Sequence, residues 1–118
     1  MTSLEVADDQ AWLAALGVLP STEEASGDDY VRELVIPVSD SEEVRVTWDV
    51  TDGSVRVRHL RDGSIVLDLF RELATRLTVV STGSAREVVV EYGSADWSGR
   101  ARVQVLPEVR VEDNVLRS

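Results

Sequence analysis

The amino-acid sequence predicts a mainly β (α+β) protein, an antiparallel meander folded as a sandwich or a partly open barrel, with a short N-terminal helix. Three observations predict it. Val-rich segments in which apolar and polar residues alternate recur from Val31 onward, turn signals separate most of them at the short spacing of hairpins, and the clearest helical pattern lies before residue 20. The 118 residues, 43% of them hydrophobic, suffice for one core, so we expect a single domain over 1–118.

The first expected element is a short amphipathic helix over 8–16. Two aspartates lie in its first turn, where acids suit the positive end of a helix, and Gly17 with Pro20 supplies its stop. We expect this helix to cover an open edge or end of the sheet. The stretch that follows, 20–30, is acidic, rich in small residues and without periodicity, which is typical of a surface linker.

An antiparallel β core is expected over 31–111. The alternating pattern occurs in seven segments: VRELVIPV, EVRVTWDV, SVRVRHL, SIVLDLF, RLTVVS, REVVVEY and RARVQVL. Turn signals such as DSE, TDG, RDG and STGSA divide most of them, and connections this short join neighbouring antiparallel strands. The sequence therefore predicts a meander of hairpins. It leaves the last segment, VRVEDNVLRS, either as one more strand or as a free tail.

The segment 68–77, DLFRELATRL, carries two signals at once. Leu69, Leu73 and Leu77 lie along a helical stripe, and the segment contains no Gly, Pro or Asn to mark a turn. Its neighbours nevertheless alternate as strands do. Two interpretations stay open, a second short helix near 69–77 or a strand, a turn and another strand.

Two Asp-Gly pairs predict how the central strands pair. A two-residue loop at Asp52-Gly53 sets Trp48 opposite Val57, and a three-residue loop over 61–63 sets Val57 opposite Leu67. One face of the sheet is then apolar and consists of Val44, Val46, Trp48, Val50, Val55, Val57, Ile65, Leu67 and Leu69. The other face carries a row of charged residues that pair across the strands, a predicted structural charge ladder of Asp49, Arg56 and Asp68.

Charge is distributed unevenly along the chain. The net charge is −10 at pH 7, and residues 1–43 carry 11 acids against Arg32 alone, whereas 44–118 carry equal numbers of acids and arginines. The electrostatic field of this negative charge repels nucleic acid and acidic membranes and attracts basic proteins. We therefore expect a protein partner, with a basic one favoured, and neither nucleic acid nor a membrane. The residues expected to contact this partner are Trp97, Glu23, Glu24, Asp28 and Asp29.

Trp97 allows two interpretations. The stretch SADWSG places it at a predicted loop tip, where a large aromatic side chain would be partly exposed and could anchor a partner. The alternative is a side chain folded back over the sheet edge.

Groups that catalysis requires are scarce in this sequence. The chain has no cysteine and no lysine, which excludes thiol, cysteine–zinc and Schiff-base chemistry, and it contains none of the motifs GxGxxG, GxxxxGK[ST] and GxSxG. His59 is the one histidine, and we expect it at a sheet rim, on the face opposite Asp68. We predict no catalytic, cofactor-binding or metal-ligating residue and no cofactor, and we favour a protein that is not an enzyme.

Three functions remain compatible with these observations. The first is a non-catalytic accessory or protein–protein interaction domain. The second is an acidic inhibitor or immunity-type protein that covers a basic target protein. Salt would weaken this binding because it screens the attraction between opposite charges. The third is a small-molecule-binding domain, which requires a closed pocket on the apolar face.

Two further expectations concern location and assembly. The N-terminus has acids where a signal peptide carries basic residues, and no apolar run is long enough to span a membrane, so we expect a cytoplasmic protein. The Val-rich run 87–92, if it lay at a sheet edge, would allow a homodimer.

Overall fold

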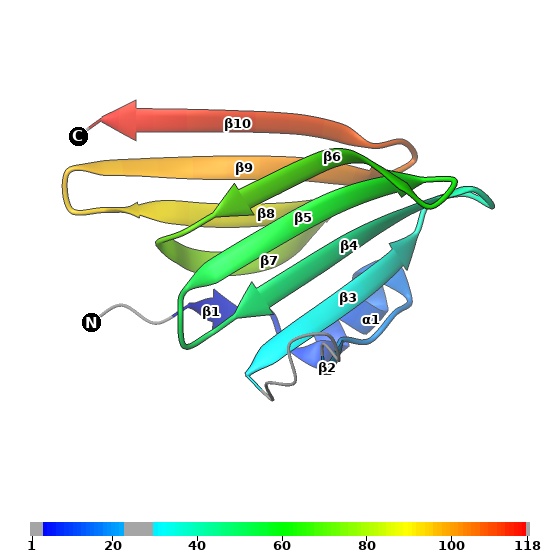
Figure 1. Ribbon diagram of the computed structural model, residues 1–118, viewed down its shortest axis with the longest axis horizontal. Coiled ribbons are helices and arrows are strands. Elements are labelled where there is room, and N and C mark those ends of the chain that lie inside the picture. The colour runs from blue at the N-terminus through cyan, green and yellow to red at the C-terminus, as the bar shows by residue number, and fades with distance from the viewer. Residues whose placement is uncertain (1–3, 23–29, 118) are drawn as a thin grey trace.

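The computed structural model describes residues 4–22 and 30–117, which form two β-sheets packed face to face (Figure 1). The elements follow in the order β1 (Glu5–Val6), α1 (Asp9–Leu16), β2 (Ser21–Thr22), β3 (Val31–Pro37), β4 (Glu42–Asp49), β5 (Ser54–Arg61), β6 (Ser64–Arg71), β7 (Ala74–Thr82), β8 (Ala85–Ser94), β9 (Trp97–Leu106) and β10 (Arg110–Arg117). Sheet A contains β1 and β7 to β10, and sheet B contains β2 to β6. The predicted mainly β fold is confirmed, in its sandwich form.

Within each sheet, strands that are neighbours in sequence are neighbours in space. β3 to β6 and β7 to β10 each form an antiparallel meander, as the short turn signals predict. β1 is the exception because it runs parallel to β7, and Ala7 N–H donates to Leu77 O at 2.9 Å just beyond it. The final segment forms β10, so the strands continue past residue 111, where the predicted core ended.

Capping residues determine where α1 begins and ends. Asp8 Oδ1 accepts a hydrogen bond from the Ala11 N–H at 2.8 Å, whereas Gly17 adopts a left-handed φ of 72° and donates its N–H to Leu13 O at 2.9 Å. The helix predicted over 8–16 is confirmed. No helix in the described part of the chain is long and apolar enough to cross a membrane.

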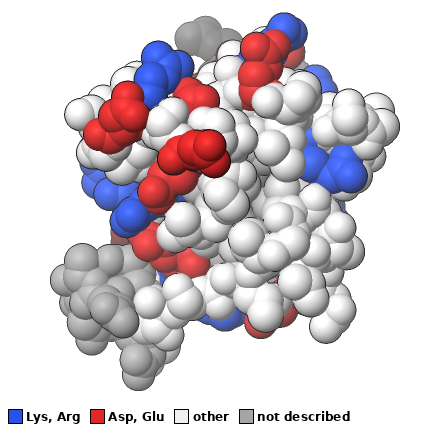
Figure 2. All heavy atoms as spheres, turned by 90° about the vertical axis from the view of Figure 1, so that its right-hand side faces the viewer, with Lys and Arg blue, Asp and Glu red and all other residues white. Residues whose placement is uncertain are grey.

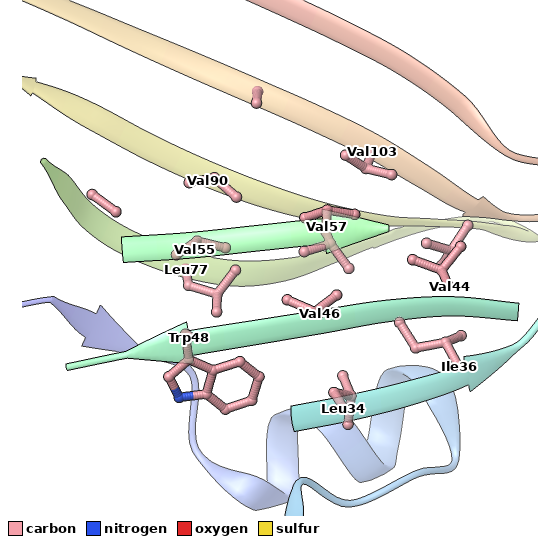
Figure 3. Packing of buried hydrophobic residues seen from close by; sticks show 14 of the residues in the cluster. Leu34, Ile36, Val44, Val46, Trp48, Val55, Val57, Leu77, Val90 and Val103 are labelled. Carbon is pink, nitrogen blue, oxygen red and sulfur yellow. The ribbon is translucent and has the colours of Figure 1, made fainter. Parts of the chain in front are cut away.

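The core lies between the two sheets, and α1 closes it along one side (Figure 3). Its largest fully buried side chains are Trp12, Leu34, Ile36, Leu77, Val44, Val46, Val55, Val57, Val88, Val90, Val103 and Val105. The ring of Trp12 stacks on that of Trp48, with centroids 5.9 Å apart and planes at 23°, and Leu16 packs against the same core. The apolar face of sheet B is thus filled by sheet A and the helix, which contradicts the closed pocket of a small-molecule-binding domain.

The chain between β6 and β7 is a tight turn. β6 continues to Arg71 and β7 begins at Ala74, so the interpretation as a strand, a turn and another strand is confirmed and the second short helix near 69–77 is wrong. Leu73 takes a positive φ of 57° and redirects the chain, and the Ala74 N–H donates to Gly53 O at 2.8 Å. The helical stripe is overridden because the backbone on either side of the turn pairs with β5 and β8.

The first Asp-Gly hairpin has a longer turn than predicted. Trp48 pairs with Val55 and not with Val57, so four residues, 50–53, connect the strands instead of two. The pairing is shifted by two positions, which keeps the side chains of both strands on their predicted faces because the side-chain period is also two. Val50 falls in the turn and is 39% exposed, so its place on the core face was wrong.

The second Asp-Gly hairpin combines a two-residue turn with a β-bulge. Asp62-Gly63 has positive φ at both positions, 52° and 78°, which is the backbone of a type I′ turn, so the predicted three-residue loop is wrong. That turn alone would set Val57 against Asp68 and mix the two faces. Val66 is left unpaired as a bulge, so that Val57 lies opposite Leu69 and the apolar side chains of the two strands share one face.

The sheet edges also differ from the expectation. The Val-rich run 87–92 lies in β8, which is hydrogen-bonded to β7 on one side and β9 on the other, so pairing between copies through this run is wrong. β10 forms one edge of sheet A and β6 one edge of sheet B, and both lie far from α1 (Figure 1).

Candidate protein-binding surface

His59 is buried near the end of β5, where Glu42 of β4 holds its imidazole. The His59 side chain is 8% exposed, and its Nε2 lies 3.2 Å from Glu42 Oε1. The same oxygen accepts from Arg61 Nε at 3.0 Å, and Ser39 Oγ donates to Oε2 at 3.2 Å. The hydrogen bond from Arg61 outweighs burial and lowers the pKa of Glu42. The imidazole therefore faces an ionised carboxylate that is already shared with the strand and the turn beside it.

Two hairpin turns meet at this end of sheet B. The Val38 and Ser39 N–H groups both donate to Glu42 O, at 3.0 and 3.2 Å, and close the β3–β4 turn. The Asp62 N–H of the β5–β6 turn donates to Ser41 O at 2.7 Å. Because successive hairpins alternate in direction, the turns after β3 and after β5 share one end of the sheet, and this bond joins them into one surface.

We call this surface the acidic end; its acidic residues are Asp40, Glu42, Glu43 and Asp62. It contains a shallow hollow, whose apolar lining residues are Val35, Pro37 and Leu60. Glu42 and Glu43 pair with neighbouring arginines at 3.0 and 2.6 Å, whereas none of the described cations lies within ion-pair distance of Asp40 or Asp62. Figure 2 faces this end and shows acidic side chains gathered over one half of it. The acidic end thus offers carboxylates to an incoming cation.

The outer face of sheet B carries ion pairs in an arrangement that differs from the predicted row. Arg56 Nε and Nη2 donate to the two oxygens of Asp68 at 2.9 and 2.5 Å, and this contact lowers the pKa of Asp68. The pair is diagonal, because Asp68 lies directly opposite Arg58. Asp49 does not lie opposite Arg56; its carboxylate accepts from Thr51 N and Oγ1 at 2.9 and 2.6 Å in the β4–β5 turn.

Trp97 lies at the first position of β9 and is half-buried. Its ring meets that of Tyr92 edge-on, with centroids 5.9 Å apart and planes at 69°, and it packs against the core. Its contact with a partner stays a prediction. The four linker acids expected to contact a partner, Glu23, Glu24, Asp28 and Asp29, lie outside the described residues.

A cluster of polar groups joins the two sheets on the side away from α1. The Tyr92 hydroxyl donates to Asp113 Oδ1 at 2.6 Å, Arg71 pairs with Oδ2 of the same carboxylate, and the Arg71 guanidinium lies 5.3 Å from the centre of the Tyr92 ring. Arg71 belongs to sheet B and Asp113 to sheet A. No local pattern reveals this pair, because its members are 42 residues apart in the sequence.

We expect acid unfolding to depend on Asp113. Burial raises the pKa of this carboxyl group, but hydrogen bonds from Tyr92 and Arg71 and the charge of Arg71 outweigh it, so the pKa lies below its usual value. The stabilisation is complete above the unfolded pKa of about 3.9 and is lost as the pH falls through the folded pKa. Asp113→Asn should lower the free energy of unfolding by about 1–3 kcal/mol at neutral pH. It should also flatten the pH dependence below about pH 5.

Urea denaturation at a series of pH values measures this effect. Asn114→Ala, a change at the exposed and uncharged next residue, should leave the slope of stability against pH as it is in the wild type. Equal slopes for wild type and Asp113→Asn would contradict the assignment.

The sequence revealed the acidity of the chain but not where the acidic side chains come together on the folded surface. Asp40 and Asp62 lie in the turn signals DSE and RDG, and the alternation of hairpins was the available indication that these turns share an end. The hydrogen bond between Asp62 and Ser41 joins the turns of two different hairpins, so no local sequence pattern predicts it. Within residues 4–22 and 30–117, no group of three or more His, Cys, Asp or Glu side chains is placed to hold a metal ion.

Comparison with known proteins adds one likeness of fold. No protein-family model matches the chain, and no curated protein matches its sequence significantly. The chain is similar to one from a solved structure described as a contact-dependent growth inhibition toxin–immunity protein complex from Klebsiella pneumoniae 342. The TM-score is 0.79 at 10% sequence identity, over 98% of this chain and 100% of that one. The two-sheet architecture thus recurs over its whole length in a chain of a two-protein complex.

Proposed function

We propose that this protein is an acidic inhibitor of the immunity type, which binds a basic protein and covers the site through which that protein acts. The observation that carries the proposal is the full-length likeness of fold to a chain of a toxin–immunity protein complex. Such a complex contains two kinds of chain, the toxin and its inhibitor. The net charge of −10 favours the inhibitor, and so does His59, whose imidazole already contacts Glu42. The broader role of a protein–protein interaction domain is contained in this proposal.

The acidic end is the surface that we assign to the basic partner. Asp40 and Asp62 stand in adjoining turns with no described cation beside them, so an arginine or lysine of the partner would not have to displace an existing ion pair. Val35, 39% exposed at the same hollow, supplies apolar contact beside the charges. Opposed charges accelerate the encounter of two proteins and select the partner more than they raise affinity.

A salt series on an identified partner tests the proposal. Proteins of the native lysate are captured on the immobilised chain at low salt, identified and purified, and the activity of each is measured with and without the chain. We expect stoichiometric inhibition of a basic protein, with an association rate that falls about tenfold or more between about 50 and 500 mM salt. A partner whose activity is unchanged, or a complex insensitive to salt, would contradict the proposal.

Charge reversal locates the surface. The double variant Asp40→Arg with Asp62→Arg should bind the partner about tenfold or more weakly, chiefly through slower association. The matched control is Asp52→Arg with Asp96→Arg, which changes the net charge equally in the β4–β5 and β8–β9 turns at the other end of the molecule (Figure 1). An equal loss with both variants would show that the acidic end has no special role.

A further inference from the structure

β10 is a long and regular free edge. It pairs with β9 over eight consecutive residues without a bulge, and no described strand lies on its other side. The other edges are blunted: β6 by the bulge at Val66, β3 by β2 and Pro37, and β7 by β1 and the packing of α1. Bulges, prolines, lysines and inward-pointing charges are the usual protection of an edge strand. β10 has no bulge, proline or lysine, and the charge of its inward-pointing Asp113 is balanced by Arg71.

Apolar side chains are exposed on both faces of β10. Val111 and Val115 point to the inner side of sheet A, because they lie opposite Val103 and Gly99, yet they are 40% and 60% exposed. Sheet B ends at β6 and leaves them uncovered. Leu116, on the outer side, is 69% exposed. An additional strand beside β10 would cover side chains on both faces.

The charges of this edge are largely balanced within the protein. Arg110 pairs with Glu108 at 2.7 Å, and Asp113 pairs with Arg71 of β6. Two copies, each of net charge −10, repel one another wherever uncompensated carboxylates meet, as they would at the acidic end. An approach along β10 avoids most of this repulsion, which favours a second copy as the occupant of the edge.

We propose that β10 pairs antiparallel with β10 of a second copy, with the two-fold axis at Asp113, so that sheet A continues through the dimer. In this register Val111 faces Val115 of the second copy, and Glu112 faces Asn114. A shift that places the axis at Glu112 would set Val111 opposite Asp113 and would separate the two valines. At the axis itself, each Asp113 carries its own Arg71. A symmetric dimer of this kind uses the same strand twice and closes on itself.

Measuring the molecular mass of the purified chain in solution at a series of concentrations tests the dimer. We expect sedimentation velocity to show a shift from monomer to dimer over roughly a hundredfold rise in concentration. Val115→Lys should stay monomeric with an unchanged circular dichroism spectrum, whereas Val80→Lys, at a valine 43% exposed on β7 of the same sheet, should dimerise as the wild type does. A wild type that stays monomeric, or a Val115→Lys variant that dimerises equally, overturns the proposal.

Cysteine cross-linking tests the register, since the chain has no cysteine of its own. In the double variant Val111→Cys with Val115→Cys, the thiol at position 111 of one copy faces the thiol at position 115 of the other. Mild oxidation should therefore give a covalent dimer. Within one copy the two positions are about 13 Å apart along the strand, too far for a disulfide. Each single variant should cross-link far less, and equal cross-linking of single and double variants would overturn the register. Both tests use the purified chain alone, so their result is independent of the proposed inhibition.

Discussion

Trp12→Ala is expected to lower the free energy of unfolding by about 3–5 kcal/mol, a large part of the stability of a domain this size. The side chain of Trp12 is completely buried, stacks on Trp48 and donates its Nε1–H to Ala7 O at 3.0 Å. Alanine would leave a cavity between the two sheets along the side that α1 closes, and it would leave the carbonyl without its donor. Equilibrium urea denaturation measures the loss.

The neighbouring position supplies the control for this variant. Leu13 follows Trp12 in the same helix but is 42% exposed, so Leu13→Ala removes an apolar side chain without emptying the core. It should cost less than about 1 kcal/mol. Equal destabilisation by the two variants would contradict the assignment of this loss to the burial of Trp12.

Gly93→Ala is expected to destabilise by about 2–5 kcal/mol, through backbone strain and a steric clash together. Gly93 has a φ of 139°, which L residues rarely adopt, and a Cβ there would lie 2.4 Å from the Trp97 carbonyl oxygen. The close approach of these two backbones lies in the hairpin that holds the Trp97 ring against Tyr92. Thermal unfolding gives the loss of stability.

Gly83→Ala separates strain from clash. Gly83 also has a positive φ, 59°, but a Cβ there would meet no atom within 4 Å. Its replacement should cost only the left-handed backbone penalty, about 1–2 kcal/mol. If Gly93→Ala were no worse than Gly83→Ala, the contact with Trp97 would have no energetic importance.

If the proposed function is right, stability and partner binding depend on different parts of this protein. The contacts of Trp12 and Gly93 hold the sandwich together, whereas Asp40 and Asp62 are turn residues without a described ion pair. Even exposed ion pairs contribute only about 0–1 kcal/mol to folding. Charge reversal at the acidic end should therefore change binding while the protein stays folded, which makes the binding test interpretable.

Local patterns of residues were sufficient to predict the strands, the helix and the acidity of the chain. The alternation of apolar and polar residues predicted the strands and most of their inner faces, and the two aspartates with Gly17 and Pro20 predicted the helix α1. The net charge and its concentration in residues 1–43 were also evident. These properties are local because side-chain direction in a strand repeats every two residues, whatever the strand pairs with.

How the strands pair depends on contacts between segments that are distant in the sequence. The turn at Leu73, the bulge at Val66 and the ion pair between Arg71 and Asp113 each depend on backbone or side-chain partners that come from distant segments. A shift of two residues keeps every side chain on its face, so alternation alone could not determine the register. The acidic end arose in the same way, because the Asp62 N–H must reach Ser41 O across two hairpins before their carboxylates become one surface.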